Sequence, residues 1–318
     1  MIEIAQRKWE QIDLKTLATL TRSTFNFEGR GEYSQEQIER HLTTLQERFP
    51  FETVFVATLN ETIVGWTGVE RQTENIGEMG RWHPYIANVP ERDMVAELLI
   101  SEVIKYANEN RMNRLEISFG NISESSMVAY NKRCSWLKSN NWSLVEDTFF
   151  MDKDASTEIP DVGIPEGFSL HPLLENNDDE LYSCHYASFT NSKAREFYGL
   201  SEDEKRQQFN KLYDRTQPIN AEASFVLKKD DKIAGMILVI SREDEEYISV
   251  VAVHPSYRGQ GLAKALLYTG IQKAREQETA NISIGVDVVN TPAVELYKKF
   301  GFEVRSRLSF HSWSADNR

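Results

Sequence analysis

The residue types best suited to chemistry lie in one short loop, which follows an apolar run ending at Val253 and opens a stretch with helical spacing. Unpaired backbone N–H groups at a helix start bind anions, helped by the positive end of the helix dipole. Glycine lets the backbone approach a ligand closely, and arginine adds a forked, permanently charged donor for phosphate oxygens. The loop therefore predicts an anion site, although glycines there could serve only to bend the chain. Its residues are Arg258, Gly259, Gln260, Gly261, Leu262 and Ala263.

The loop matches neither common nucleotide motif, because it lacks both a Gly-Lys-Ser/Thr ending and a G-x-G-x-x-G pattern. It resembles instead the phosphate loop of the GNAT superfamily, the acyl-CoA-dependent N-acyltransferases. The family pattern Q/R-x-x-G-x-G/A is matched here, and so is a preceding Val-x-Val-x-Pro. A second family feature follows in the correct order. It consists of an asparagine, then a helix that contains a tyrosine, and then the pair Gly-Phe. The matching residues are Val251, Val253, Pro255, Arg258, Gly261, Ala263, Asn290, Ala293, Tyr297, Gly301 and Phe302.

The resemblance implies a role for each of these positions. Loop amides from Arg258 to Ala263 would hold the pyrophosphate of acetyl-CoA, the co-substrate. The backbone of Val251 and Val253 would line the pantetheine arm and polarise the thioester carbonyl. Asn290 would cap its helix, bind the cofactor arm, or do both. No pattern in the sequence predicts a metal site.

Two side chains are candidates for proton transfer. Tyr297 carries a phenol that can protonate a departing thiolate, although it could also be a half-buried aromatic residue on an amphipathic helix. Glu246 is the candidate base. The period-two rule places it on the face opposite Tyr247, the position where many family members carry glutamate. A solvated hairpin turn at Glu243–Glu246, with deprotonation through a water chain, is the alternative.

Length and element order predict two domains that position these residues. The 318 residues suffice for two domains of about 150 each. We predict a degenerate GNAT-like domain at 1–151, a Pro- and Gly-containing linker at 152–167 and a catalytic GNAT domain at 168–318. Each is predicted to be α/β, a mostly antiparallel, partly parallel twisted sheet flanked by helices. Similar hairpins, 54–70 and 225–240, favour duplication.

The first half lacks the chemistry of the second. Aligning its predicted helix at 95–109 with that at 263–277 sets Pro90 opposite Arg258 and Asp93 opposite Gly261. Proline removes a backbone donor, and aspartate places a negative charge where the pyrophosphate would lie. The first half is therefore expected to have lost cofactor binding and to serve the structure or one wall of the substrate cleft.

Charge and cysteine content restrict the class of partner. The net charge of −13 argues against a nucleic-acid binder, which needs a basic face. Two cysteines and no long apolar run predict a cytoplasmic protein without membrane contact. The leading hypothesis is a tandem N-acetyltransferase, which resembles mycothiol synthase in its two-domain arrangement. It would transfer an acetyl group from acetyl-CoA to a primary amine of a small molecule or peptide. The transfer would be direct, within a ternary complex. The alternative is a non-catalytic acyl-CoA sensor or partner-binding module.

Overall fold

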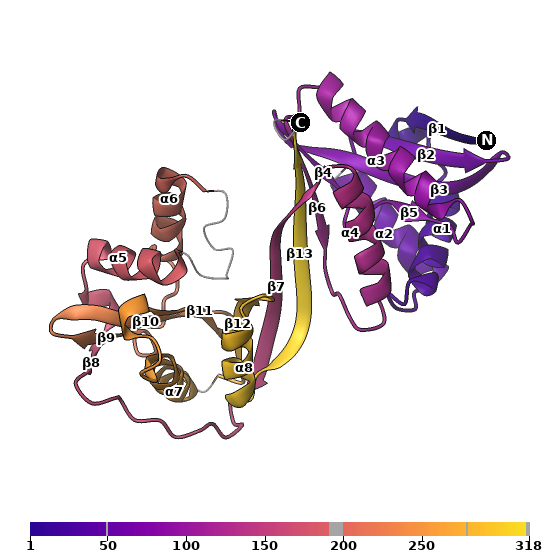
Figure 1. Cartoon of the computed structure of the whole chain (residues 1–318). Helices are drawn as coiled ribbons and strands as arrows, with labels where there is room; N and C mark the ends of the chain where they lie inside the picture. Colours follow the sequence, from indigo (N-terminus) through magenta and orange to yellow (C-terminus); the bar gives the residue numbers. More distant parts are fainter. Residues whose placement is uncertain (49, 191–199, 278, 316–318) are drawn as a thin grey trace. The chain divides into compact units, whose positions relative to one another are not determined.

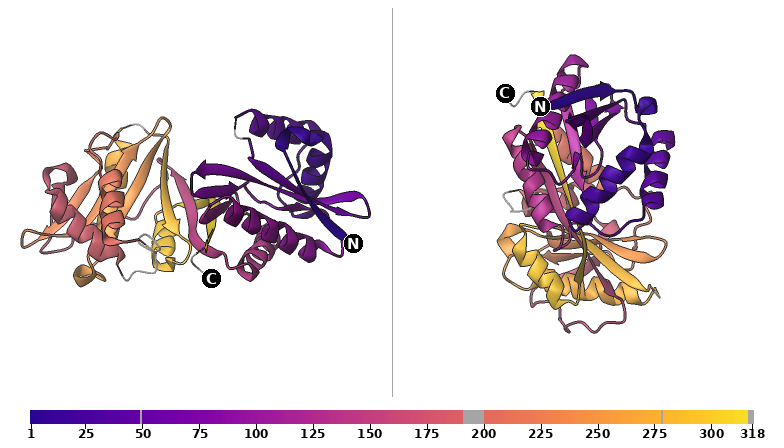
Figure 2. Two further views of the ribbon diagram at one scale, coloured as in Figure 1. Left: turned by 90° about the horizontal axis from the view of Figure 1, so that it is seen from above. Right: turned by 90° about the vertical axis from the view of Figure 1, so that its right-hand side faces the viewer.

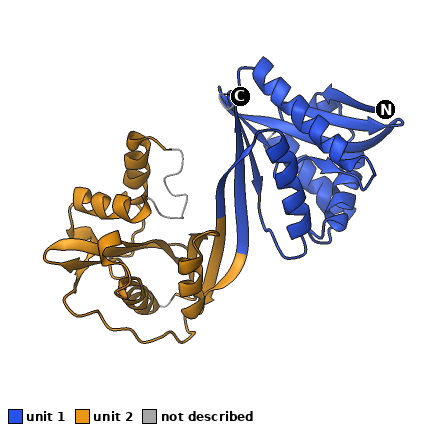
Figure 3. Cartoon of the chain, viewed as in Figure 1, with its two compact units in different colours: residues 1–147, 306–318 blue, residues 148–305 orange. Residues whose placement is uncertain are grey.

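The chain forms two compact units (Figures 1 and 3). A computed structural model describes residues 1–48, 50–190, 200–277 and 279–315. Unit 1 comprises Met1–Asp147 and Ser306–Arg318, and unit 2 comprises Thr148–Arg305. The predicted boundaries differ from this division. Residues from 306 onward lie in unit 1, because strand β13 (Glu303–Ser314) pairs there with β6 (Arg114–Phe119). The predicted linker also begins too early, because β7 (Ser143–Asp154) continues through residue 154 and pairs with β12 (Asn281–Asp287) in unit 2.

Unit 1 is a twisted mixed sheet covered by helices on both faces. Its strand order is β1-β2-β3-β4-β6-β13, antiparallel except for the parallel pair β4 and β6. Helices α1 and α2 cover one face, and α3 and α4 cover the other (Figure 2). The remaining elements are β1 (Ile2–Arg7), η1 (Trp9–Gln11), α1 (Leu14–Phe27), α2 (Gln35–Arg48), β2 (Thr53–Leu59), β3 (Thr62–Thr73), β4 (Ile76–Met79), β5 (Tyr85–Ile86), α3 (Arg92–Glu109) and α4 (Met127–Ser139).

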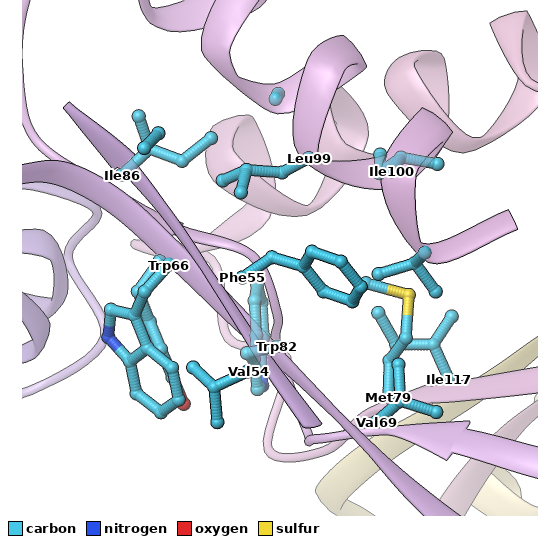
Figure 4. Close-up of a cluster of buried hydrophobic side chains, with 14 of the residues drawn as sticks. Val54, Phe55, Trp66, Val69, Met79, Trp82, Ile86, Leu99, Ile100 and Ile117 are labelled. Atoms are coloured by element: carbon cyan, nitrogen blue, oxygen red, sulfur yellow. The ribbon is translucent and has the colours of Figure 1, made fainter. Parts of the chain in front are cut away.

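The core of unit 1 is rich in tryptophan. Trp66, in β3, is fully buried and donates its indole N–H to Thr21 Oγ1 at 3.0 Å. Trp82 is also buried and donates to the carbonyl of Gly120 at 2.8 Å. Figure 4 labels both tryptophans in this buried cluster, across the strand from Leu99 and Ile100 of α3. Each indole N–H has a partner, as core packing of a tryptophan requires.

Unit 2 repeats this build. Its strand order is β7-β12-β11-β10-β9-β8, antiparallel except for β11 and β12. Helices α5 and α6 pack on one face through one apolar cluster, and α7 and α8 pack on the other through a second. The remaining elements are β8 (Ser169–Pro172), η2 (Leu173–Glu175), α5 (Asp178–Phe189), α6 (Glu202–Leu212), β9 (Phe225–Lys229), β10 (Lys232–Ser241), β11 (Glu245–Val253), η3 (Pro255–Tyr257), α7 (Leu262–Arg275) and α8 (Thr291–Lys299).

Two local features recur at matching places in the units. Asn60-Glu61 and Asp230-Asp231 both have positive φ in the two-residue turn of a hairpin, as such turns require. Gly65 and Gly235 both lie early in the second hairpin strand, where a Cβ would approach leucine side chains, Leu99 and Leu266 respectively. The predicted α/β fold with two similar units is therefore confirmed.

Unit 2 is expected to lose stability in acid because of His185 in α5. This side chain is fully buried and contacts the rings of Phe209 and Tyr213. Burial disfavours its charged form and lowers its pKa to about 4. The unfolded chain, with the ordinary value of 6.5, binds more protons than the folded chain between pH 6.5 and 4. The free energy of unfolding therefore falls as the pH falls through this window, by roughly 1 kcal/mol per pH unit.

Urea titrations of wild type and His185→Gln, followed by far-UV circular dichroism, test this expectation. Between pH 7 and pH 4.5, the free energy of unfolding should fall more in the wild type than in the variant. A constant difference would show that His185 does not titrate on unfolding.

Candidate active site

The predicted anion loop lies between a strand and a helix, as the sequence indicated. Strand β11 ends at Val253, the short helix η3 follows, and Gly261 is the N-cap of α7. Gly259 and Gly261 have φ of +77° and +83°, left-handed conformations in which a side chain is strained. The first backbone bond of the helix runs from the N–H of Ala265 to the carbonyl of Gly261. The preceding amides are thus available to an anion.

The loop forms one wall of a pocket of about 440 Å³, and α8 forms another. A Cβ built on Gly259 would meet no atom within 4 Å, and one on Gly261 would meet only Pro165, at 3.9 Å. The space beside these two glycines is therefore not occupied by the protein's own side chains. The pocket is lined by Val253, Tyr257, Arg258, Gly259, Gly261, Leu262, Ala263, Lys264, Pro292, Glu295, Leu296 and Lys299.

The pocket is cationic in a chain of net charge −13. Arg258, Lys264 and Lys299 line it, and none of them forms an ion pair with the residues that the structure describes. Arg258 donates from Nη2 to the carbonyl of Ser188 at 2.6 Å. This contact ties the end of α5 to the loop, so the guanidinium also has a structural task. A phosphorylated ligand fits this donor set.

The outer edge of β11 opens beside the loop. The parallel ladder between β11 and β12 ends at the pair Ile248 and Ile284, whereas pairing with β10 continues to Val253. A bulge at Leu238/Val239 of β10 marks the change in register. Among the described residues, strand pairing on the β12-facing edge therefore does not extend to Val251 and Val253, although the carbonyl of Val253 accepts from Arg258 Nε at 3.4 Å. This is the edge that the resemblance assigns to the pantetheine arm.

Tyr297 lies on α8, is buried (6% exposed) and does not line the pocket. Burial, with a smaller contribution from Tyr247, raises the pKa of its phenol. The group is therefore protonated throughout the neutral range, as a proton donor must be. Asn290 occupies the N-cap position of α8, yet its side chain makes no capping hydrogen bond. Its assignment to the cofactor arm stays a prediction, as does that of Gln260, which is exposed outside the pocket lining.

Glu246 differs from the solvated turn that was the alternative. Glu243 and Asp244 are exposed, but Glu246 is only 6% exposed, and its Oε1 accepts from Ser241 Oγ at 2.9 Å. Its Oε2 has no hydrogen-bond partner among the described residues. Alternating burial along β11 places it opposite Tyr247, as predicted. Glu246 does not line the pocket, so its role as base stays a prediction.

Unit 1 has a counterpart cavity whose cations are already paired. A cavity of about 590 Å³ lies between the starts of α3 and α4 and is lined by Arg92 and Lys132, among others. Arg92 pairs with Glu28, and Lys132 pairs with Asp93 at 2.5 Å. The N-cap of α3 is the acidic residue Glu91, whereas the N-cap of α7 is Gly261. The sequence alignment had set Asp93, two residues later than Glu91, opposite Gly261. This electrostatic arrangement disfavours a phosphate there.

Sequence reasoning missed the contributions of η3 and α8 to the pocket. Tyr257, Lys264, Glu295 and Lys299 were not singled out. Lys264 is three residues past the N-cap, so its position at the anion site could have been found from helix geometry. Lys299 and Glu295 share one face of α8 at i, i+4 spacing, but their approach to the loop depends on tertiary packing. Among the described residues, no group of three or more metal-ligating side chains comes together, and no helix has the length and apolar character needed to cross a membrane.

A solved structure shares this fold. The chain aligns with a GCN5-related N-acetyltransferase from Sphaerobacter thermophilus at a TM-score of 0.54 and 17% identity, over 98% of this chain and 95% of that one. This likeness establishes the fold, the GNAT fold in tandem, for the chain as a whole.

Sequence comparison gives the family. Residues 182–302 match the acetyltransferase (GNAT) family. The spore coat polysaccharide biosynthesis protein SpsD of Bacillus subtilis is 26% identical over 150 residues, 47% of this chain and 52% of that one. A mycothiol acetyltransferase of Kytococcus sedentarius is 28% identical over 153 residues, 46% and 49% of the two chains. The chain thus spans about half the length of the curated relatives it matches. The similarity to the GNAT acetyltransferases is thus carried by residues 182–302, within unit 2, where the sequence motifs predicted it.

Proposed function

We propose that unit 2 catalyses transfer of an acetyl group from acetyl-CoA to a primary amine of a small molecule or peptide. The observation that carries the proposal is the glycine-capped start of α7, open to a cationic pocket beside the edge of β11 that lies beyond its pairing with β12. The first-turn amides of α7 would hold the pyrophosphate, with Lys264 and Lys299 near the phosphates. Bound acetyl-CoA supplies an activated thioester.

The chain's own groups would then manage the protons. Backbone N–H groups at Val251 and Val253 would polarise the carbonyl of the thioester. The acceptor amine must lose a proton, and Glu246 is the proposed base, acting directly or through water. Tyr297 would hold the proton that the departing thiolate takes up. The two cysteines are free thiols, which suits the proposed cytoplasmic location.

A screen of CoA release tests the activity. Purified protein is incubated with acetyl-CoA and, separately, with polyamines, aminoglycosides, amino acids and peptides that have free N-termini. We expect release of free CoA that depends on one class of amine. Calorimetric binding of acetyl-CoA without turnover on any amine would favour the alternative, a non-catalytic sensor. Absence of binding would contradict both.

Gly261→Ala should weaken the binding of acetyl-CoA. A methyl group at φ +83° costs roughly 1–2 kcal/mol in backbone strain and lies against the amides that face the anion. We expect the Kd measured by calorimetry to rise at least tenfold. Gly163→Ala is the matched control, because its Cβ meets no atom within 4 Å and its φ is not positive. An unchanged Kd in a folded Gly261→Ala protein would remove the loop from the binding site.

A further inference from the structure

Unit 1 contains a second, chemically different cavity of about 410 Å³. It lies between α1, α2 and the ends of β3 and β4, and it does not share lining residues with the cavity beside α3 and α4. Aromatic rings form much of its wall, namely Phe25, Tyr33, Trp82 and Tyr85. A volume of this size accommodates a small molecule.

One side of the cavity carries a buried guanidinium with an unused donor. Arg30 lines the cavity with its side chain 9% exposed, and its Cζ lies 4.0 Å from the centroid of Phe25 and 4.2 Å from that of Trp82. The Nη1 atom has no hydrogen-bond partner among the described residues, and its nearest carboxylate oxygen is Glu28 Oε2 at 3.6 Å. A buried charged N–H without a hydrogen bond is costly. An incoming anion would satisfy it. Arg81 also lines the cavity and, unlike Arg30, forms no ion pair with a described residue.

The sheet side of the same cavity carries two carboxylates. Glu70 of β3 and Glu78 of β4 are direct cross-strand partners, and neither forms an ion pair with a described residue. Burial raises the pKa of both side chains, and at Glu78 the neighbouring Glu70 raises it further. Two like charges held side by side in a partly buried wall are stabilised by a cation that enters between them.

We infer that this cavity binds a small zwitterion of the amino-acid class, with its ammonium group at Glu70 and Glu78 and its carboxylate at Arg30 and Arg81. The aromatic rings of the lining would pack against its side chain. The site belongs to unit 1, and it requires neither acetyl-CoA nor the chemistry of unit 2. The proposal is therefore independent of the proposed function, and the two are tested separately.

Calorimetric titration of the full chain with the 20 common amino acids tests the proposal. We expect at least one to bind with Kd below about 1 mM, a typical range for small-molecule sites. Its N-acetyl derivative, which lacks the ammonium group, and its amide, which lacks the carboxylate, should each bind at least tenfold more weakly. Equal binding of either derivative, or no binding by any amino acid at 10 mM, would overturn the assignment.

Variants locate the binding in unit 1. Glu70→Gln/Glu78→Gln should weaken binding at least tenfold while leaving the unfolding transition intact. Glu116→Gln is the control, because Glu116 neighbours Glu78 in the sheet but does not line the cavity. Affinity unchanged in the double variant would place the bound amino acid elsewhere and overturn the proposal, whatever the outcome of the acetyl-transfer screen.

Discussion

Tyr297→Phe is expected to lower kcat for the proposed acetyl transfer by about 100-fold or more, the scale of a lost general acid. The phenol is buried on α8, and its raised pKa keeps it protonated at neutral pH. Phenylalanine keeps the ring and its packing against Phe302, whose centroid lies 6.1 Å away, but has no proton to give. Because Tyr297 does not line the cationic pocket, the Kd of acetyl-CoA should change little. Steady-state CoA release and calorimetry measure the two quantities.

The control for this substitution is Tyr268→Phe. Tyr268 lies on α7 and packs against the same apolar cluster, so the variant loses a phenol in similar surroundings. It should retain wild-type kcat. Turnover by Tyr297→Phe at the rate of the wild type would show that Tyr297 is only a packing residue and that the departing thiolate takes its proton from elsewhere.

Glu28→Ala destabilises unit 1 by about 3–5 kcal/mol, the cost of leaving a buried charge without its partner. Glu28 Oε1 accepts from Arg133 Nη1 at 2.6 Å, and both side chains are 1% exposed. Arg92 pairs with the same carboxylate oxygen. Arg133 also donates to the carbonyls of Trp82 and Pro84, at 3.1 Å and 3.2 Å, which fix it in place. Without the carboxylate, Arg30, Arg92 and Arg133 all lose their ion pair with Glu28.

Tryptophan fluorescence isolates this effect, because all six tryptophans of the sequence lie in residues assigned to unit 1. The urea midpoint should fall sharply in Glu28→Ala. Glu36→Ala provides the control: its pair with Arg40 is exposed on α2, and its loss should cost less than about 0.5 kcal/mol. A loss below about 1 kcal/mol in Glu28→Ala would mean that the arginines find water or other partners.

Local sequence patterns were sufficient for much of unit 2. The helix predicted at 263–277 is α7, Leu262–Arg275, and the apolar run that ends at Val253 is β11, Glu245–Val253. Both have strong apolar periodicity and clear glycine boundaries. In unit 1, α1, α2 and the short strand β4 were not predicted, because their apolar positions are few or interrupted by polar residues.

Tertiary pairing could not be read from local patterns. Strand β7 pairs with β12 and strand β13 pairs with β6, and in each case the partner is distant in the sequence. The burial of Glu246 was missed for a similar reason: its neighbours Glu243 and Asp244 are exposed, and only the pairing with Ser241 of β10 encloses it. The anion loop, in contrast, is a local structure, and its residues alone were enough to place it at the start of a helix.

Hydrogen–deuterium exchange with and without saturating acetyl-CoA tests the central claim most directly, because one sample reports both units. We expect slower exchange for amides at 259–264, where Gly261 caps α7, and no change at 91–96, where Glu91 caps α3 and Asp93 pairs with Lys132. Protection at the start of α3, or unchanged exchange at 259–264 with acetyl-CoA bound, would contradict the assignment of acyl-CoA binding to unit 2.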